Sequence, residues 1–479
     1  MENKRDSWGS NLGFILAAVG SAVGLGNIWG FPYKMGKSGG FTFLIAYLLL
    51  AVFVGFVVMI SELAMGRHVG KGVIGCYHTL SKKFKWVGWL AVFSPFIIMS
   101  FYSVLGGYCI EYMALNMSNL AFAGAEISAG ADLFTSMLMN PFGNVIFTVL
   151  FLVICYLINR GGISGGIEKF NKVGMPALFV MLVIVIIRSL TLDGAVEGLK
   201  FMFVPGYAVE GGFIAEEPNF ITVLATAGGQ MFFSLSLGAG VMITYGSYLD
   251  KKQDLGKSAM IIVGMDTVVA LMAGLCVIPG RFALDPNGAL GGPELLFITM
   301  QNVFDKMGPA GPVFGILFYL LVFFAAISSS ISMLEVIVAH FCDKAREKGK
   351  GDRRKLYSAI VVVICAALCA LVCADGMGSN HISPAELLGL AGAKLPGWST
   401  SWLGLFDSVA EGLLMPLGAL LMCLMISWEL KPDALRQEIL LNGENRPWVY
   451  DFFRLCVKYI TPLCMLMILY GQISDFFIV

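Results

Sequence analysis

Closely spaced glycines and a few polar residues interrupt two long apolar stretches of this chain. Asn27 lies in GFILAAVGSAVGLGNIWGFP, while Ser234 and Ser236 lie in GGQMFFSLSLGAGVMITYGSY. Unwound backbone exposes carbonyl oxygens that attract cations, and half-helix N-termini attract anions. A small zwitterion needs both, so the two stretches could bind an amino acid. The alternative is a pair of glycine-rich packing faces between membrane helices.

Two further polar features could bind a cation. The stretch FFAAISSSISMLEV places Ser328, Ser329, Ser330 and Ser332 in an apolar run. Hydroxyl oxygens are hard ligands suited to a hard cation such as sodium. They could equally bond to carbonyls of their own helix. Asp266, in VGMDTVVALMAG, is a carboxylate inside another apolar run, which by default suggests a functional site.

The elements that must position these residues are membrane helices. Of the 479 residues 57% are hydrophobic and 13% charged, and mean hydropathy is +0.80. Runs this apolar predict spans of a lipid bilayer, and each must be helical because lipid offers backbone amides no partner. The fold class is therefore an all-α polytopic membrane protein, and zero net charge argues against a nucleic-acid partner. The predicted spans lie near 12–34, 41–66, 88–117, 143–159, 167–190, 220–249, 257–282, 311–342, 356–374, 402–428 and 452–476.

Lysine and arginine predict the orientation. With the N-terminus inside, most of the 32 Lys and Arg residues fall in inner segments, as the positive-inside rule requires. We therefore expect a cytoplasmic N-terminus, an external C-terminus after the eleventh span, and residence in the plasma membrane, the inner membrane in a bacterium. The outer segment 283–310 predicts a helix over the outer face, and 375–401 a lid or short helix.

The glycine-rich breaks fall in the first and sixth spans, which are corresponding positions of two halves. This pattern predicts a single domain, 1–479, with five-helix repeats of opposite topology at 12–190 and 220–428, and an extra helix at 452–476.

Several motifs resemble one known family. SAVGLGNIW, SELAMGR, QMFFSLSLGAG, TYGSY and FFAAISSSIS are similar to the neurotransmitter:sodium symporters, particularly their bacterial amino-acid-transporting branch. The resemblance covers nearly the whole chain. It implies an inverted-repeat (5+5) transporter fold with broken helices 1 and 6, importing an amino acid with sodium by alternating access.

The resemblance also implies two sodium sites and a substrate site. The first sodium would bind the substrate carboxylate together with Ala22, Asn27, Ser234 and Asp266. The second would bind carbonyls of Gly20, Val23 and Ala325 and hydroxyls of Ser328 and Ser329. The substrate carboxylate would meet Leu25, Gly26 and the Tyr102 hydroxyl, and its amine the carbonyls around Ser21, Ala22, Phe233 and Ser236. The side-chain pocket would be Ile98, Phe233, Ala239, Ser329 and Met333, with Phe233 as its lid.

Two positions bear on the choice of substrate. Gly24 stands where monoamine carriers of the family have an acid, so a substrate carboxylate must complete the first sodium site. This favours amino acids over amines. Ala239 stands where relatives preferring mid-sized aliphatic substrates carry a bulky aromatic residue. We expect a hydrophobic L-amino acid, large aliphatic or aromatic.

Asp266 further predicts that chloride is not required. Animal relatives bind chloride beside the first sodium; Tyr47, Gln230 and Ser234 match three of its ligands, but the fourth, a serine, falls at Ala270. Asp266 lies one helical turn earlier and would supply a fixed negative charge for the buried cations. The alternative is that Asp266 is a structural partner of a nearby serine or backbone group.

Gates on both sides are also implied. On the cytoplasmic side Arg5 would pair with Asp343, supported by Trp8 and Tyr248. Gly166 and Pro176 flank nine residues, which matches a family pattern for unwinding the fifth span during inward release.

On the outer side Gly30 replaces the family's usual arginine, while its aspartate partner remains as Asp407. Lys34, four residues on, could replace that arginine. The missing arginine leaves a non-transporting amino-acid sensor as the alternative function. An enzyme is not expected, because neither a His-rich ligand set nor a Ser–His–Asp arrangement can be argued from the sequence.

Overall fold

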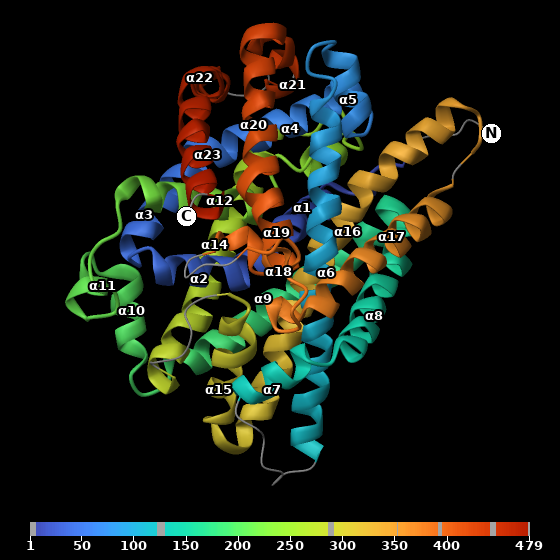
Figure 1. Ribbon diagram of the computed structural model, residues 1–479. Coiled ribbons are helices and arrows are strands. Elements are labelled where there is room, and N and C mark those ends of the chain that lie inside the picture. Colours follow the sequence, from blue (N-terminus) through green and yellow to red (C-terminus); the bar gives the residue numbers. More distant parts are fainter. Residues whose placement is uncertain are drawn as a thin grey trace.

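The computed structural model of the chain describes residues 6–121, 130–285, 292–351, 353–390, 395–440 and 447–477. Every regular element within these ranges is a helix (Figure 1). Nine described helices are long and apolar enough to cross a membrane, and one bent pair makes a tenth span. The remaining predicted span, the sixth, is divided into two helices too short to be counted among them. All eleven predicted segments therefore correspond to helical segments, which confirms the all-α polytopic fold.

The continuous spans have the following bounds. The second comprises α3 (Phe41–Leu50), η2 (Ala51–Gly55) and α4 (Phe56–Val69), the third is α6 (Val87–Ala121), the fourth is α8 (Pro141–Asn159), and the fifth joins η3 (Ile163–Glu168) to α9 (Lys169–Leu190). The seventh is α14 (Leu255–Leu284), the eighth joins η5 (Gly308–Ala310) to α16 (Gly311–Glu347), and the ninth joins α17 (Arg354–Asp375) to η6 (Gly376–Gly378). The tenth comprises α19 (Trp402–Asp407), η8 (Ser408–Leu414), α20 (Met415–Leu424) and η9 (Met425–Leu430), and the eleventh α22 (Pro447–Leu455), η12 (Cys456–Ile460) and α23 (Thr461–Phe477).

Short helices connect the spans. They are α5 (Val73–Leu80), α7 (Gly130–Leu138), α10 (Ala195–Phe203), α11 (Tyr207–Glu210), η4 (Leu295–Thr299), α15 (Met300–Asp305), α18 (Pro384–Leu387), η7 (Gly397–Ser399), η10 (Pro432–Leu435) and α21 (Arg436–Ile439). The helix predicted within 283–310 is confirmed by η4 and α15, and the short helix within 375–401 by α18.

The first span is broken where its glycines predict. α1 comprises Asn11–Ala22, and the Ser10 hydroxyl caps its N-terminus by accepting a hydrogen bond from the Gly13 amide. The chain leaves the helix at Val23, which has φ −75° and ψ 95°. It resumes as η1 (Gly26–Gly30) and α2 (Phe31–Lys37), bent by 45° from α1.

The sixth span is broken between α12 (Phe220–Ser234) and α13 (Val241–Gly246). Ser236, Gly238 and Gly240 have φ of 53°, 75° and 70°, a left-handed region that ends a right-handed helix. Two reasons require a glycine at position 238. Its φ lies in the left-handed region, and a Cβ there would lie 2.2 Å from the Met415 carbonyl oxygen. Its amide donates to the buried Glu62 carboxylate at 2.7 Å, so α4 holds the break in place.

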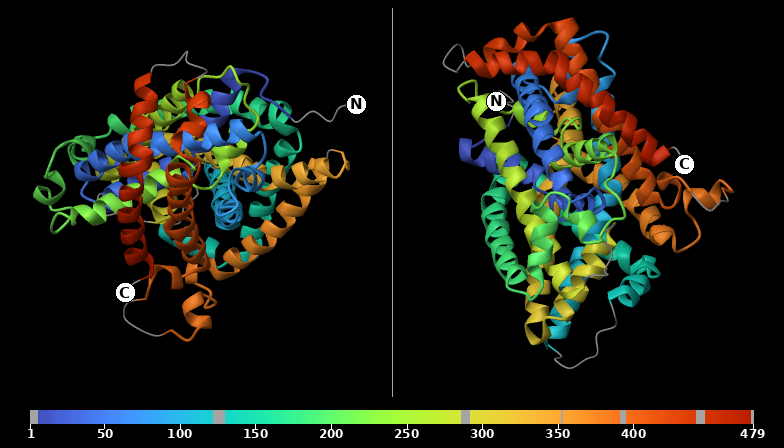
Figure 2. Two further views of the ribbon diagram at one scale, coloured as in Figure 1. Left: turned by 90° about the horizontal axis from the view of Figure 1, so that it is seen from above. Right: turned by 90° about the vertical axis from the view of Figure 1, so that its left-hand side faces the viewer.

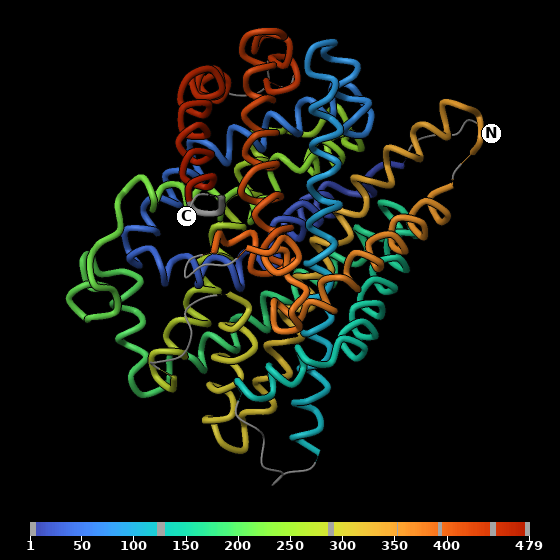
Figure 3. Tube along the Cα trace, viewed as in Figure 1, coloured from blue at the N-terminus to red at the C-terminus, as the bar shows by residue number. Residues whose placement is uncertain are grey.

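Both breaks lie deep in the bundle. α6 and α16 pack extensively on one another, and α1 contacts both α14 and α16. The α1 and α12 segments run through the middle of the bundle in Figures 2 and 3, whereas α23 lies at its edge. The fifth span stays helical from Ile163 to Leu190 through Pro176, so the unwinding implied for it is absent from this conformation.

Candidate functional site

Asp266 of α14 joins the two breaks. Its carboxylate accepts hydrogen bonds from the Asn27 amide at 2.8 Å, the Ser234 hydroxyl at 2.9 and 3.0 Å, and the Tyr47 hydroxyl at 3.1 Å. The Asn27 amide oxygen in turn accepts the Gly24 amide at 3.1 Å. All five residues are buried. The structure therefore places two of the predicted first-sodium residues, Asn27 and Ser234, against the carboxylate of a third, Asp266.

A second oxygen-rich cluster lies between α1 and α16. The Ser328 hydroxyl donates to the Ala325 carbonyl at 2.9 Å and lies 3.4 Å from the Val23 carbonyl. The Ser329 hydroxyl donates to the Ser21 carbonyl at 3.1 Å. Serine hydroxyls of the eighth span thus meet carbonyls that the break in the first span leaves free. Ser328 thus bonds to a carbonyl of its own helix, as the alternative interpretation expects, and it also faces the break in the first span.

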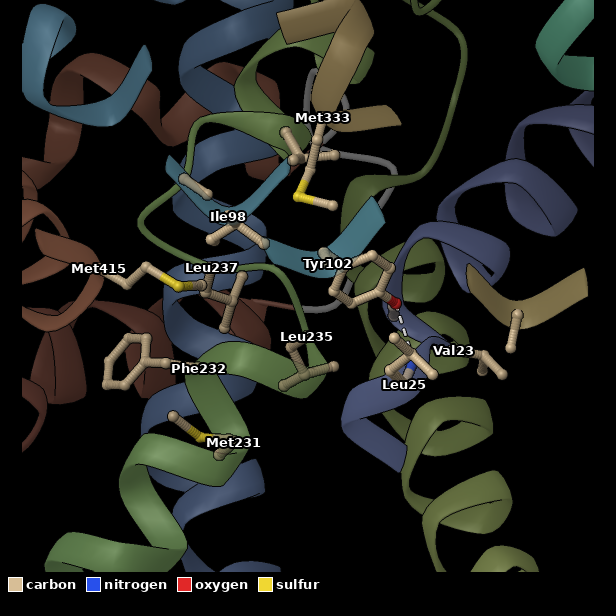
Figure 4. Packing of buried hydrophobic residues seen from close by; sticks show 14 of the residues in the cluster. Val23, Leu25, Ile98, Tyr102, Met231, Phe232, Leu235, Leu237, Met333 and Met415 are labelled. Carbon is tan, nitrogen blue, oxygen red and sulfur yellow. Dashed lines mark hydrogen bonds between the residues drawn. The ribbon is translucent and has the colours of Figure 1, made fainter. Parts of the chain in front are cut away.

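Polar groups of the predicted substrate site already contact one another. The Leu25 amide donates to the Tyr102 hydroxyl at 2.8 Å (Figure 4). The Ser21 carbonyl accepts from Ser236 at 3.0 Å as well as from Ser329. The Leu25 amide and the Tyr102 hydroxyl are hydrogen-bond donors suited to a carboxylate. The Ser21 carbonyl and the hydroxyls of Ser236 and Ser329 are acceptors suited to an ammonium group.

The predicted pocket is a cavity of about 20 Å³. Its lining comprises Ala22, Gly24, Gly26, Ile98, Tyr102, Phe233, Ser236, Ala239, Ser329, Met333 and Met415. That volume holds about one water molecule, so a larger ligand requires these side chains to move. Met333 and Met415, which face the cavity in Figure 4, are flexible side chains able to do so. Met415 was not predicted.

Two glycines keep this cavity open. A Cβ on Gly24 would lie 2.4 Å from the Ser329 hydroxyl and 2.5 Å from that of Tyr102, and one on Gly26 would lie 2.9 Å from the Phe233 ring. Position 24 therefore has no room for the acidic side chain found in monoamine carriers.

The sequence pattern of the sodium:neurotransmitter symporter family matches residues 5–132 and 135–477. The chain belongs to that family. The sodium-dependent transporter YhdH of Bacillus subtilis is 34% identical over 99% of both chains. A sodium-dependent transporter of Methanocaldococcus jannaschii is 32% identical over 91% of this chain and 84% of its own. The crystal structure of MhsT in complex with L-phenylalanine is similar at a TM-score of 0.83 and 34% identity, over 98% of this chain and 100% of that one. The chain is thus a sodium-dependent transporter, as the motifs predicted.

Most of the residues predicted for the cytoplasmic gate have hydrogen-bond or ion-pair partners in the structure. Trp8 donates its indole N–H to the Tyr245 carbonyl at 3.1 Å. The Tyr248 hydroxyl donates to the buried Glu335 at 2.7 Å, and Glu335 also pairs with Arg354 of α17. The predicted pairing of Arg5 lies outside the described residues. Asp343 accepts the Gly72 amide at 2.8 Å and lies 3.4 Å from Arg346.

At the predicted outer gate, Lys34 pairs with Glu411 of η8 and not with Asp407, one helical turn earlier. Both partners are largely buried, with side chains 13% and 4% exposed. At Gly30 the space of a side chain is taken by Gln230, whose amide oxygen would lie 2.6 Å from a Cβ.

Proposed function

We propose that the chain imports an amino acid across the plasma membrane together with sodium ions bound at two sites. The observation that supports the proposal is that Asn27 from the first break and Ser234 from the second both contact Asp266, while Ser328 lies against the first break at Val23. The first sodium is assigned to Ala22, Asn27, Ser234 and Asp266, and the second to Gly20, Val23, Ala325, Ser328 and Ser329. The N-terminus is assigned to the cytoplasm and the C-terminus to the outside, following the distribution of lysine and arginine.

Chloride independence is part of this proposal. Tyr47 and Ser234, which match chloride ligands of animal relatives, both donate to the Asp266 carboxylate. The two hydroxyl groups that could bind a chloride ion thus already donate to an anionic group of the protein, the Asp266 carboxylate. A fixed carboxylate offsets the desolvation of buried cations without a mobile anion.

For the substrate we propose a hydrophobic L-amino acid, large aliphatic or aromatic. The small side chain of Ala239 lines the cavity together with Phe233 and the flexible Met333, and the similar protein MhsT was crystallised with L-phenylalanine. The sensor alternative rested on the lost outer arginine; the buried pair of Lys34 with Glu411 supplies an ion pair at that side and favours transport.

Proteoliposomes test the proposal. Uptake of labelled phenylalanine is expected with an inward sodium gradient, and is expected to be lost with choline and unchanged with gluconate in place of chloride. Competition of this uptake by leucine, tryptophan and glycine measures which size of side chain the pocket prefers. A preference for glycine would overturn the proposal of a large hydrophobic substrate. Binding of phenylalanine without sodium-driven uptake would favour the sensor.

The second sodium site has a matched control on the same helix. Ser328→Ala with Ser329→Ala should raise the sodium concentration needed for half-maximal uptake. Ser330→Ala makes the same chemical change one residue further on, at a hydroxyl without a hydrogen-bond partner in the described structure. It should leave sodium dependence unchanged. If Ser330→Ala raised the half-maximal sodium concentration as much as the double variant does, the assignment of Ser328 and Ser329 to the second sodium site would be wrong.

A further inference from the structure

A polar cavity lies between the end of the tenth span and the start of the eleventh, away from the substrate site. It measures about 550 Å³ and is lined by Ser427, Trp428, Lys431, Pro432, Asp433, Asp451, Arg454, Leu455, Lys458 and Tyr459. The Ser427 hydroxyl donates to the Val457 carbonyl at 2.8 Å, which fixes one helix end against the other. The cavity is thus a built feature of two packed helices.

Three cations face this cavity. Lys431, Arg454 and Lys458 form no ion pair with a carboxylate in the part of the chain that the structure describes, whereas Lys34, Arg67 and Arg354 all do. Two aspartates, Asp433 and Asp451, also line the cavity. The Asp433 carboxylate accepts a hydrogen bond from the Tyr450 hydroxyl at 2.7 Å.

Lys431 also has φ 60° and ψ 140°, an uncommon conformation for a residue with a side chain. Strained positions of this kind often mark functional sites.

The surroundings of the cavity are those of a membrane interface. Trp428 and Tyr459 line it with 56% and 58% of their surface exposed, as aromatic residues at the level of lipid headgroups do. From it an exposed apolar row runs along the eleventh span: Leu455, Tyr459, Leu463, Leu466 and Tyr470. Their spacing places them on one helix face over about 22 Å, enough to accompany an acyl chain through one leaflet of roughly 15 Å.

We propose that this cavity, Lys431, Arg454 and Lys458 with the row along the eleventh span, binds an anionic glycerophospholipid. The phosphodiester lies against the three cations, a headgroup hydroxyl donates to Asp451, and one acyl chain follows the row. Basic pockets between membrane helices on the cytoplasmic side recognise such headgroups, and the proposed orientation puts this cavity on that side. The apolar row is the reason for choosing a lipid over a free phosphate.

Native mass spectrometry of the purified full-length protein tests this. We expect dioleoyl phosphatidylglycerol to bind more tightly than dioleoyl phosphatidylcholine, and glycerol 3-phosphate not to compete. Each cation near an anionic lipid contributes about a fivefold effect, so Lys431→Gln, Arg454→Gln and Lys458→Gln together should weaken phosphatidylglycerol binding on the order of 100-fold.

The matched control removes three exposed cations elsewhere, by Lys82→Gln, Lys83→Gln and Lys85→Gln, and should leave binding unchanged. If the triple cavity variant does not fold, Lys458→Gln alone should weaken binding about fivefold. Equal binding of both lipids, wild-type affinity of the cavity variants, or an equal loss in the control would overturn the proposal. Effective competition by glycerol 3-phosphate would identify a free-anion site instead.

Discussion

The buried outer pair of Lys34 and Glu411 predicts strong coupling between two substitutions. Replacing one partner leaves the other charge buried alone, which costs about 3–5 kcal/mol, whereas replacing both by apolar groups of similar volume is often neutral. With side chains 13% and 4% exposed, water can offset little of that cost. Lys34→Met and Glu411→Leu should each destabilise the protein by roughly 3 kcal/mol, and the double variant by less than either.

The assay is unfolding in mixed detergent micelles, followed by tryptophan fluorescence, for the four proteins of the double-mutant cycle. A coupling free energy of about 3 kcal/mol or more is expected from these values, at the upper end of the range seen for contacting residues. Combining Lys34→Met with Asp407→Asn tests the partner that the sequence suggested, and should give much weaker coupling. The exposed pair of Lys200 and Glu197 serves as a control and should show little, since water screens it. Additive effects of Lys34→Met and Glu411→Leu would refute the reasoning.

Three further predictions concern charge, size and pH. Asp266→Asn removes the carboxylate that Asn27 and Ser234 contact, and should raise the sodium concentration for half-maximal uptake about 10–100-fold, with added chloride restoring part of the loss; unchanged sodium dependence would contradict the assignment. Ala239→Phe should weaken competition by tryptophan about 10–100-fold and spare valine, since an apolar pocket discriminates by ~1–3 kcal/mol, and equal losses for both would argue against a size filter. Burial opposes ionisation of Glu438, but hydrogen bonds from Lys251 and Arg67 outweigh it and lower its pKa. This contribution to stability is present above the unfolded value of about 4.3 and is lost as pH falls through the lowered pKa. The melting-temperature difference between wild type and Glu438→Gln should therefore narrow below about pH 4, and a constant difference would show that the charge is irrelevant.

The sequence predicts the spans and their breaks because both depend on local properties. Apolar length fixes each span, and the chain leaves the helix at Val23 and at Ser236 through Gly240, within the predicted glycine-rich stretches. The gathering of Asn27 with Ser234 and Asp266 follows from the family's motifs, since Asn27 lies more than two hundred residues from both and such separations carry no local signal.

The contacts that the sequence could not predict depend on the conformation of long side chains. Lys34 lies within reach of two carboxylates one helical turn apart, Asp407 and Glu411, and its flexible side chain pairs with Glu411. The contact of Glu62 with the Gly238 amide joins residues 176 positions apart. Glu62, in the motif SELAMGR, is a carboxylate inside a predicted span, and this is the signal that could have found its role. The occupation of the Tyr102 hydroxyl by the Leu25 amide depends on the conformation of the break.

The buried carboxylate at position 266 has a consequence for the energetics of the whole cycle. For the proposed two sodium ions, a zwitterion and this fixed charge, the loaded carrier bears one net positive charge at its centre and the empty carrier one negative. An inside-negative membrane potential then drives the loaded carrier inward and the empty carrier back outward. The work is about 2.3 kcal/mol per charge crossing the full field at 100 mV. If the proposed ion stoichiometry and chloride independence hold, both half-cycles move charge across the membrane, and neither needs an external anion.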